Sequence, residues 1–288
     1  MNKRVAVKVL LIWSLWALVA AGAIAALPAA AQSAPAAATP GESSPKARAL
    51  LDKMIAALGG DAFLNYTTRG EQGRIYSFYH GRPNGAGTQF WYFWQAPDRD
   101  RMEIGKKRDV ARVHNGDKGY EITYKGTSAL GKDDMRDYLR SRNHSISTVL
   151  RQWLNAPGTV LLYAGTGIAD NRMTEQVTVL NAKDETVTIA VDTTTYLPVR
   201  TSFTYRDPVD KLNSEETETY GNYRLEQGMM TAHTVVRAKN GEMIRQQFLT
   251  RVEYNPQLSA PLFQASVTYK PAGQESDNGN RGEGGHPQ

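Results

Sequence analysis

The sequence predicts a mainly β (α+β) fold: a curved antiparallel sheet of about ten or eleven strands that forms a half-open barrel, with amphipathic helices on its concave side. From Thr68 onward, short segments of alternating apolar and polar residues are separated by turns rich in Gly, Asn and Asp, which is typical of an antiparallel meander. Apolar residues at helical spacing occur before the first strand and again midway. The concave side of a long, twisted sheet is where these helices can bury their apolar faces.

The first 31 residues have the three regions of a secretory signal peptide. Basic residues at the start, an uncharged run over residues 9–26 and small residues at 29–31 predict export, with cleavage after Ala31. An uncleaved membrane anchor is the alternative, because the apolar run is nearly long enough to span a bilayer. The sequence contains no Cys, which excludes a lipid-anchored signal and disulfide bonds. We therefore expect a periplasmic mature protein.

Charge argues against nucleic acid as a partner. The formal net charge is +5, but Lys3, Arg4 and Lys8 belong to the signal peptide, and without them 31 basic residues face 29 acidic ones. No later stretch is basic enough to indicate a nucleic-acid track, since Gly105-Lys106-Lys107-Arg108-Asp109 is typical of a charged hairpin turn.

The first element after the signal peptide is a helix. Residues 32–44 are rich in Ala, Pro and Ser and predict a flexible leader. Ser44-Pro45 is a good helix start and Gly59-Gly60 a good stop. Between them, one face carries apolar residues at helical spacing, namely Ala47, Leu50, Leu51, Met54, Ile55 and Leu58.

The most unusual strand is Gln89–Gln95, which holds five consecutive aromatic residues before Ala96-Pro97. As a strand it places Phe90, Tyr92 and Trp94 on one face and the other two aromatics on the opposite face. Two interpretations follow: a central core strand, or a strand with one face lining an apolar ligand cavity.

Strands at both sides of this segment continue the meander, which is interrupted once between Gly131 and Gly158. There, apolar residues at helical spacing predict two helices with a break at Asn143-His144. Strands then resume at Val160 and end at Tyr254. In the last strand, strict alternation places Ile244, Phe248, Val252 and Tyr254 on one face and Arg245, Gln247, Arg251 and Glu253 on the face that meets water.

The sequence predicts a single domain over residues 45–270. No linker between strands is long enough to divide it, and the polar, Gly-rich residues 271–288 predict a disordered tail.

No constellation of residues indicates an enzyme. The five His residues have no metal-ligand spacing, no G-x-S-x-G run occurs, and the Gly-rich segment from Gly81 to Gly87 opens no helix. We expect neither catalytic nor metal-binding residues and no cofactor.

The order of these features resembles the periplasmic lipoprotein carriers of the LolA/LolB type and the wider outer-membrane lipoprotein-sorting superfamily. The features are the signal peptide, the first helix, the aromatic strand ending Gln95-Ala96-Pro97, then Arg99-Asp100-Arg101-Met102, Asn115-Gly116 with Tyr120, the helical insertion, and Pro261-Leu262-Phe263. The resemblance covers most of the mature chain. Carriers of this family have an arginine immediately before the motif proline that hydrogen-bonds the helical lid. This chain has Ala96 there, so that contact is not carried over.

The resemblance implies a soluble periplasmic carrier that shelters acyl chains of lipoproteins or other lipids in an apolar cavity, exchanging them with membrane-associated donor and acceptor proteins. We expect a monomer. A sensor module of the same fold is the alternative, and a secreted hydrolase is a third possibility. The cavity residues would be Phe90, Tyr92 and Trp94 on the sheet and Met135, Leu139, Ile146, Val149, Leu150 and Trp153 on the helical side; otherwise they fill a dry core.

Overall fold

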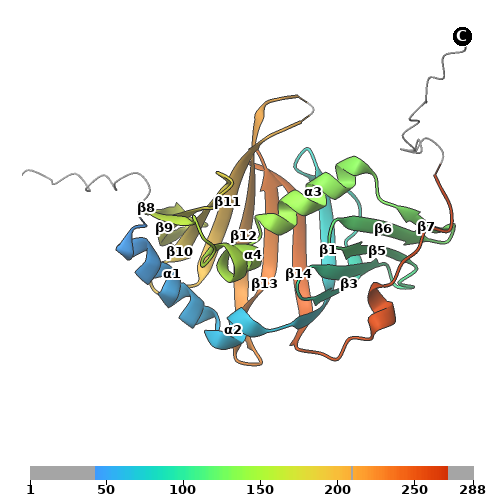
Figure 1. Ribbon diagram of the computed structural model, residues 1–288, viewed down its shortest axis with the longest axis horizontal. Helices are drawn as coiled ribbons and strands as arrows, with labels where there is room; N and C mark the ends of the chain where they lie inside the picture. The colour runs from blue at the N-terminus through green and yellow to red at the C-terminus, as the bar shows by residue number, and fades with distance from the viewer. Residues whose placement is uncertain (1–42, 209, 272–288) are drawn as a thin grey trace, which may run out of the picture. The chain divides into compact units, whose positions relative to one another are not determined.

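The computed structural model describes residues 43–208 and 210–271. The predicted signal peptide, nearly all of the predicted leader and nearly all of the predicted tail lie outside the described residues. In the described part, one curved antiparallel sheet of 14 strands carries the fold (Figure 1). The sheet is not closed into a barrel, because β7 and β8 lie at its two opposite edges.

The strand order explains this arrangement. The chain runs from the centre of the sheet to one edge, crosses back as helices, and returns to the centre from the other edge, so that β14 pairs with β1. The first half comprises β1 (Thr68–Tyr79), β2 (Arg82–Pro83), β3 (Thr88–Gln95), β4 (Arg99–Ile104), β5 (Val110–Asn115), β6 (Lys118–Thr123) and β7 (Gly126–Ala129). The second half comprises β8 (Val160–Ala169), β9 (Arg172–Leu180), β10 (Thr186–Asp192), β11 (Pro198–Arg206), β12 (Asn213–Glu226), β13 (Met229–Lys239) and β14 (Glu242–Tyr254).

The predicted count of ten or eleven strands is therefore too low. The two-residue strand β2 and the four-residue strand β7 have too few residues to show an alternating pattern. The curved antiparallel sheet with helices against it is confirmed.

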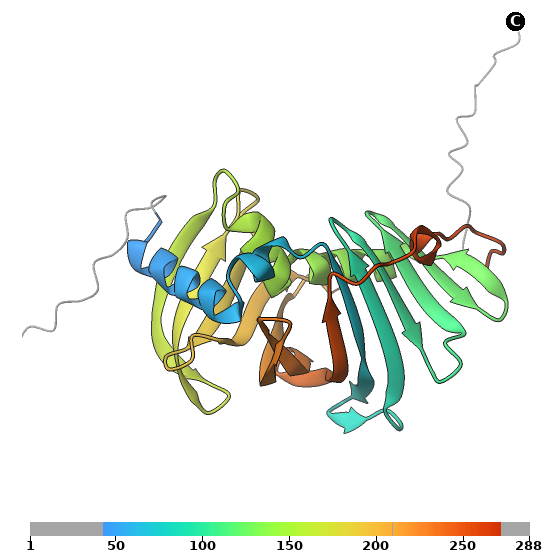
Figure 2. The same cartoon turned by 90° about the horizontal axis from the view of Figure 1, so that it is seen from below.

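The helices are α1 (Pro45–Leu58), α2 (Asp61–Asn65), α3 (Lys132–Asn143), α4 (Ile146–Thr148), the π-helical turn η1 (Val149–Trp153) and the 3₁₀ turn η2 (Ala260–Phe263). Because the chain must return from β7 to β8, α3 and α4 cross the face of the sheet between its two halves, as Figures 1 and 2 show. The predicted helix break at Asn143-His144 is confirmed, since α3 ends there.

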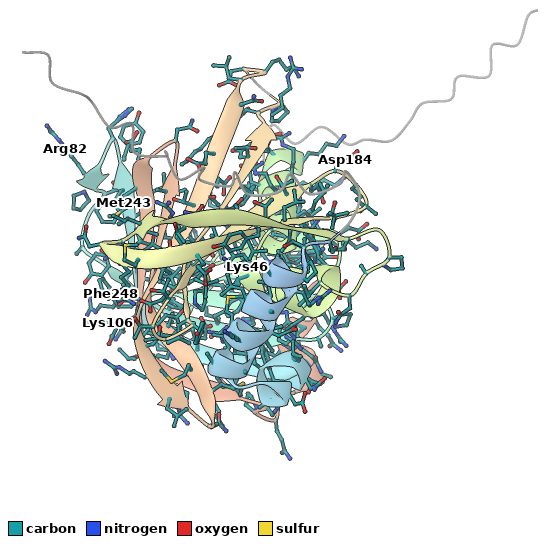
Figure 3. The ribbon with its side chains drawn as sticks, turned by 90° about the vertical axis from the view of Figure 1, so that its left-hand side faces the viewer. Lys46, Arg82, Lys106, Asp184, Met243 and Phe248 are labelled. Atoms are coloured by element: carbon teal, nitrogen blue, oxygen red, sulfur yellow. The ribbon has the colours of Figure 1, made fainter. Side chains whose placement is uncertain are left out.

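Helix α1 forms as its sequence predicts. The Ser44 hydroxyl accepts a hydrogen bond from the Ala47 amide at 3.3 Å, and Gly59, with φ of 129°, ends the helix. All six predicted apolar residues are buried. In Figure 3 this helix faces the viewer beside β8 and β9, where the Lys46 ammonium lies 3.1 Å from Glu175.

The apolar core lies under α1. Leu51 and Met54 pack against strand residues that are also fully buried, among them Leu161, Val177 and Ile189. This end of the concave face is filled with side chains.

Candidate functional site

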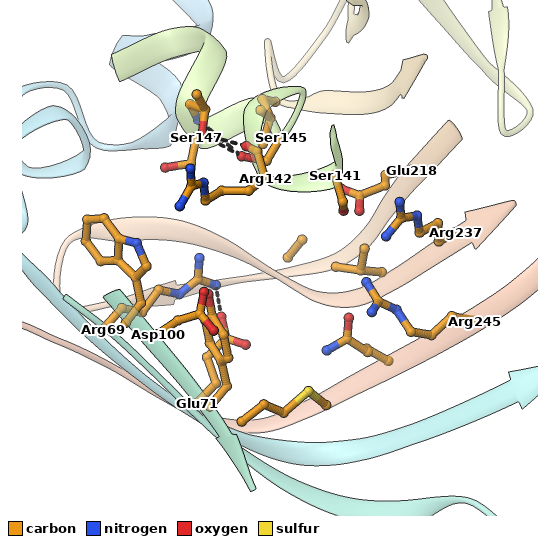
Figure 4. A pocket seen from close by; sticks show the side chains of 18 of the residues that line it. Arg69, Glu71, Asp100, Ser141, Arg142, Ser145, Ser147, Glu218, Arg237 and Arg245 are labelled. Carbon is orange, nitrogen blue, oxygen red and sulfur yellow. Dashed lines mark hydrogen bonds and ion pairs between the residues drawn. The ribbon is translucent and has the colours of Figure 1, made fainter. Parts of the chain in front are cut away.

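A cavity of about 680 Å³ lies between the concave face of the sheet and helices α3 and α4. Residues of β1, β3, β4 and β5 form one wall, and residues of β12, β13 and β14 form the other. Figure 4 shows Ser141 and Arg142 of α3 together with Ser145 and Ser147 above these walls. The volume falls within the roughly 300–1,000 Å³ of small-molecule pockets.

The aromatic strand β3 supplies the apolar wall. Phe90, Tyr92 and Trp94 all line the cavity, and their exposure differs along the strand: Phe90 is fully buried in the core, whereas the other two are half-buried. Tyr66 extends this wall, because its ring centroid lies 5.4 Å from that of Trp94 in an edge-on arrangement. Burial raises the pKa of Tyr92 well above its ordinary value, so this hydroxyl stays neutral.

The other two aromatics of β3 occupy the opposite face of the sheet, as alternation predicts. There the Arg108 guanidinium lies 4.9 Å from the ring centroid of Trp91 and 5.9 Å from that of Phe93. Glu103 accepts a hydrogen bond from Arg108 at 2.5 Å and fixes its position. Trp91 and Phe93 are thus separate from the cavity.

Charged residues stand beside the aromatic wall in register. Arg69, Trp94, Asp100 and His114 are cross-strand neighbours on β1, β3, β4 and β5. The Arg69 guanidinium lies 2.6 Å from Glu71. Burial alone would lower the pKa of Arg69, but the Glu71 carboxylate and nearby tyrosines outweigh burial and raise it. This end of the cavity therefore holds a charge-balanced pair next to apolar rings.

Helix α3 is fastened to the first half of the sheet through Tyr138. Its hydroxyl donates a hydrogen bond to Asp100, and its ring stacks on His114 at 3.5 Å between centroids. His114 also contacts Asp100, with 2.8 Å between Nδ1 and the carboxylate oxygen. Burial and then the Asp100 charge raise the pKa of Tyr138, which keeps this donor protonated.

A second fastening joins α3 to the other half of the sheet. Glu216 of β12 accepts from Arg140 of α3 at 3.0 Å and from Arg237 of β13. Burial alone would raise the pKa of the Glu216 carboxyl, but the charges of Arg237 and Arg140 outweigh burial and lower it. Glu216 is therefore ionised at neutral pH and bridges helix and sheet.

Two further contacts complete the attachment of the helical segment. Arg142 donates to the Gly116 carbonyl at 2.9 Å, and the Tyr66 and Ser147 hydroxyls lie 3.2 Å apart. These contacts, together with those of Tyr138 and Arg140, attach the helical segment to the sheet.

The structure brings only some of the predicted cavity residues to the cavity. Phe90, Tyr92, Trp94 and Ile146 line it. Val149, Leu150 and Trp153 are buried in the apolar core, where the π-helical turn places them, and are not among the residues that line the cavity.

Met135 and Leu139 do not line the cavity either. Both are half-buried on α3, and the Met135 sulfur lies against Gly119 of β6, where a side chain would collide with it. That any of the nine residues contacts a ligand stays a prediction.

The predicted faces of the last strand are wrong in its first part. Arg245 and Gln247 line the cavity, and Phe248 is 38% exposed. The register of β14 is irregular at two points: it skips Ile244 where β14 pairs with β13 and Thr250 where it pairs with β1. Thr250 lies between the two parts of the strand, so the bulge there places Arg245 and Gln247 on the same face as Val252 and Tyr254.

One sequence signal could have located the second bulge. Gly73 lies inside β1 opposite Leu249, and a Cβ on it would collide with the Phe248 carbonyl oxygen. A glycine inside a strand often marks such a close approach. With it, Arg245 becomes a candidate site residue.

Among residues 43–208 and 210–271, no group of three or more His, Asp or Glu side chains is placed to hold a metal ion. In the same part of the chain, no helix has the length and apolar character needed to cross a bilayer.

Comparisons with known proteins identify the fold. No family model matches the sequence, and no curated protein matches it. A DUF1329 family protein from Desulfovibrio piger is similar in structure, with 12% identity, 76% of this chain and 97% of that chain covered, and a TM-score of 0.53.

Two other solved structures are also similar. A putative outer membrane lipoprotein-sorting protein domain from Vibrio parahaemolyticus is 10% identical, covers 75% of this chain and 97% of its own, and has a TM-score of 0.49. A LolA superfamily protein from Nitrosomonas europaea is 11% identical, covers 76% of this chain and 97% of its own, and has a TM-score of 0.46. At these identities the likeness concerns the fold alone.

Proposed function

We propose that this chain is a periplasmic protein that binds the acyl chains of lipoproteins or other lipids in the cavity between the sheet and α3, and carries them towards the outer membrane. The observation that supports the proposal best is the cavity of about 680 Å³ beside an apolar core that is otherwise filled. A core that only stabilised the fold would have no need of this space.

The mechanism is binding, without catalysis or a cofactor. An acyl chain gains about 0.8 kcal/mol for each methylene removed from water, and the Phe90, Tyr92 and Trp94 wall offers the apolar surface. Entry requires α3 to move. Its contacts with the sheet include hydrogen bonds and ion pairs, which water can replace at a net cost of about 1 kcal/mol each.

Location and partners come from the sequence. The predicted signal peptide supports a periplasmic location of the mature chain, and the LolA-like resemblance implies membrane-associated donor and acceptor proteins. We propose a monomeric carrier.

The first test is to identify what the protein holds. We expect native mass spectrometry of protein purified from its own periplasm to show an added mass of lipid or lipoprotein. Its intact mass should correspond to a chain that begins near Gln32. Protein that retains residues 1–31 in the membrane fraction would contradict the carrier role.

The second test compares the two faces of β3. We expect Trp94→Ala to weaken binding of an acylated fluorescent probe about tenfold, because part of the cavity wall is lost. Trp91→Ala on the opposite face is the matched control and should leave binding unchanged. If Trp94→Ala binds normally and instead loses several kcal/mol of unfolding free energy, Trp94 is ordinary core.

A further inference from the structure

Arg245 lies in a row of charged residues on the cavity wall opposite the aromatic strand. In the strand register, Glu218 of β12 lies opposite Arg237 of β13, and Arg237 lies opposite Arg245 of β14. All three line the cavity, and Figure 4 shows the two arginines side by side with Glu218 next to them. The bulge at Thr250 is what turns Arg245 to this face.

The neighbours of Arg245 already have partners. Arg237 and Arg140 share the Glu216 carboxylate, the Lys239 ammonium lies 3.1 Å from Asp207, and Glu218 accepts a hydrogen bond from the Tyr220 hydroxyl at 3.0 Å. The Arg245 side chain makes no hydrogen bond or ion pair with any of the described residues. Burial, and after it the Arg237 charge, lower the pKa of Arg245, although the group remains a cation.

This arrangement is costly for the protein alone. Like charges directly opposite each other on neighbouring strands repel, and the half-buried Arg245 side chain is partly withdrawn from water without a partner, which is destabilising. An anion in the cavity would remove both costs. The planar guanidinium suits a carboxylate or phosphate, because it can donate two parallel hydrogen bonds to either.

We propose that Arg245, assisted by Arg237, binds the anionic head group, a carboxylate or phosphate, of an amphiphile whose acyl chain lies along the wall of Phe90, Tyr92 and Trp94. This inference rests on the proposed function and narrows it from acyl chains in general to acyl chains with an anionic end. The cavity offers apolar rings at one wall and an unpaired cation at the other, which matches the two ends of such a molecule.

The test compares two probes that differ only at the head group, oleate and oleyl alcohol, in calorimetric titrations with the mature protein. We expect Arg245→Gln to weaken oleate binding at least about tenfold and to change oleyl alcohol binding less than about twofold. Arg245→Lys keeps the charge without the planar fork and should give an intermediate oleate affinity. Arg251→Gln, an exposed arginine of the same strand, is the matched control and should bind both probes as the wild type does.

Each other outcome contradicts the inference in its own way. Oleate affinity that is equal in the wild type and Arg245→Gln would show that Arg245 holds no head group, while the proposed carrier role stands. If sodium phosphate alone binds as tightly as oleate and depends on Arg245, the site takes a free anion and not an amphiphile. If neither oleate nor oleyl alcohol binds the wild type, the proposed function fails and this inference fails with it.

Discussion

The two helices on the concave face, α1 and α3, are attached to the same sheet by opposite kinds of contact. Helix α1 buries six of its 14 residues in the apolar core. Helix α3 buries none, and seven of its 12 residues are charged. Its hydrogen bonds and ion pairs to the sheet include those of Tyr138 with Asp100 and of Arg140 with Glu216. Apolar packing holds an element in one place, whereas polar contacts can be exchanged with water. The difference makes α1 a fixed part of the core, and it suits α3 to the movement that the proposed function requires.

The largest expected effect is on stability, from a substitution in the core under α1. Leu51→Ala under α1 should lower the free energy of unfolding by about 3 kcal/mol, because Leu51 is fully buried and its loss leaves a void. Leu139→Ala on α3, where the side chain is half-buried, should cost about 1 kcal/mol or less. Chemical denaturation measures both. Equal losses would show that α3 is packed as firmly as α1 and would remove the basis for a mobile lid.

The next effect concerns the ion pairs that attach α3 to the sheet. Glu216→Ala should destabilise the protein by about 2 kcal/mol, because it leaves Arg140 and Arg237 without their shared carboxylate. Amide hydrogen exchange should become faster in α3 and stay unchanged in α1. The control is Glu215→Ala, since Glu215 is the exposed neighbour on the same strand. Faster exchange across both helices would mean that Glu216 supports the whole fold and not the lid.

The same carboxylate predicts a pH dependence. The pKa of Glu216 is lowered from 4.5 in the folded state, so its ionic contacts stabilise the protein at neutral pH and are lost as the pH falls below that value. We expect the unfolding free energies of the wild type and Glu216→Gln to differ fully above about pH 5 and to converge as the pH falls through the lowered pKa of Glu216. Comparing the variant with the wild type cancels the other acidic groups. A difference that is constant from pH 7 to pH 3 would contradict the lowered pKa.

The packed region around α1 and the cavity beneath α3 also differ in how far the sequence predicts them. The packed region around α1 can be predicted, because apolar burial imposes a helical spacing on the sequence. All six buried residues of α1 were identified by that spacing alone. The aromatic strand likewise shows its two faces by simple alternation.

The residues that line the cavity depend on bulges and long-range contacts, which the periodicity of the sequence does not show. The bulge at Thr250 in β14 reverses the side of the sheet on which Arg245 and Gln247 lie, so strict alternation assigned them to water. The partners of Arg140 and Tyr138 come from strands that only the long crossover brings near α3. Residues 132–143 show a helix, but nothing local tells whether its attachment is apolar or ionic.

The smallest expected effect is a gain of stability from a substitution on the cavity wall. Arg245→Met should raise the free energy of unfolding by about 1 kcal/mol, because it replaces an unpaired, withdrawn cation opposite Arg237 with an apolar side chain of similar length. Arg251→Met, on the exposed face of the same strand, should leave stability nearly unchanged. Thermal and chemical denaturation of the ligand-free protein measure both variants. A loss of stability in Arg245→Met would mean that Arg245 already contributes to the fold without a ligand. A gain would mean that the chain keeps an arginine here at the expense of its own stability, as residues that bind ligands often require.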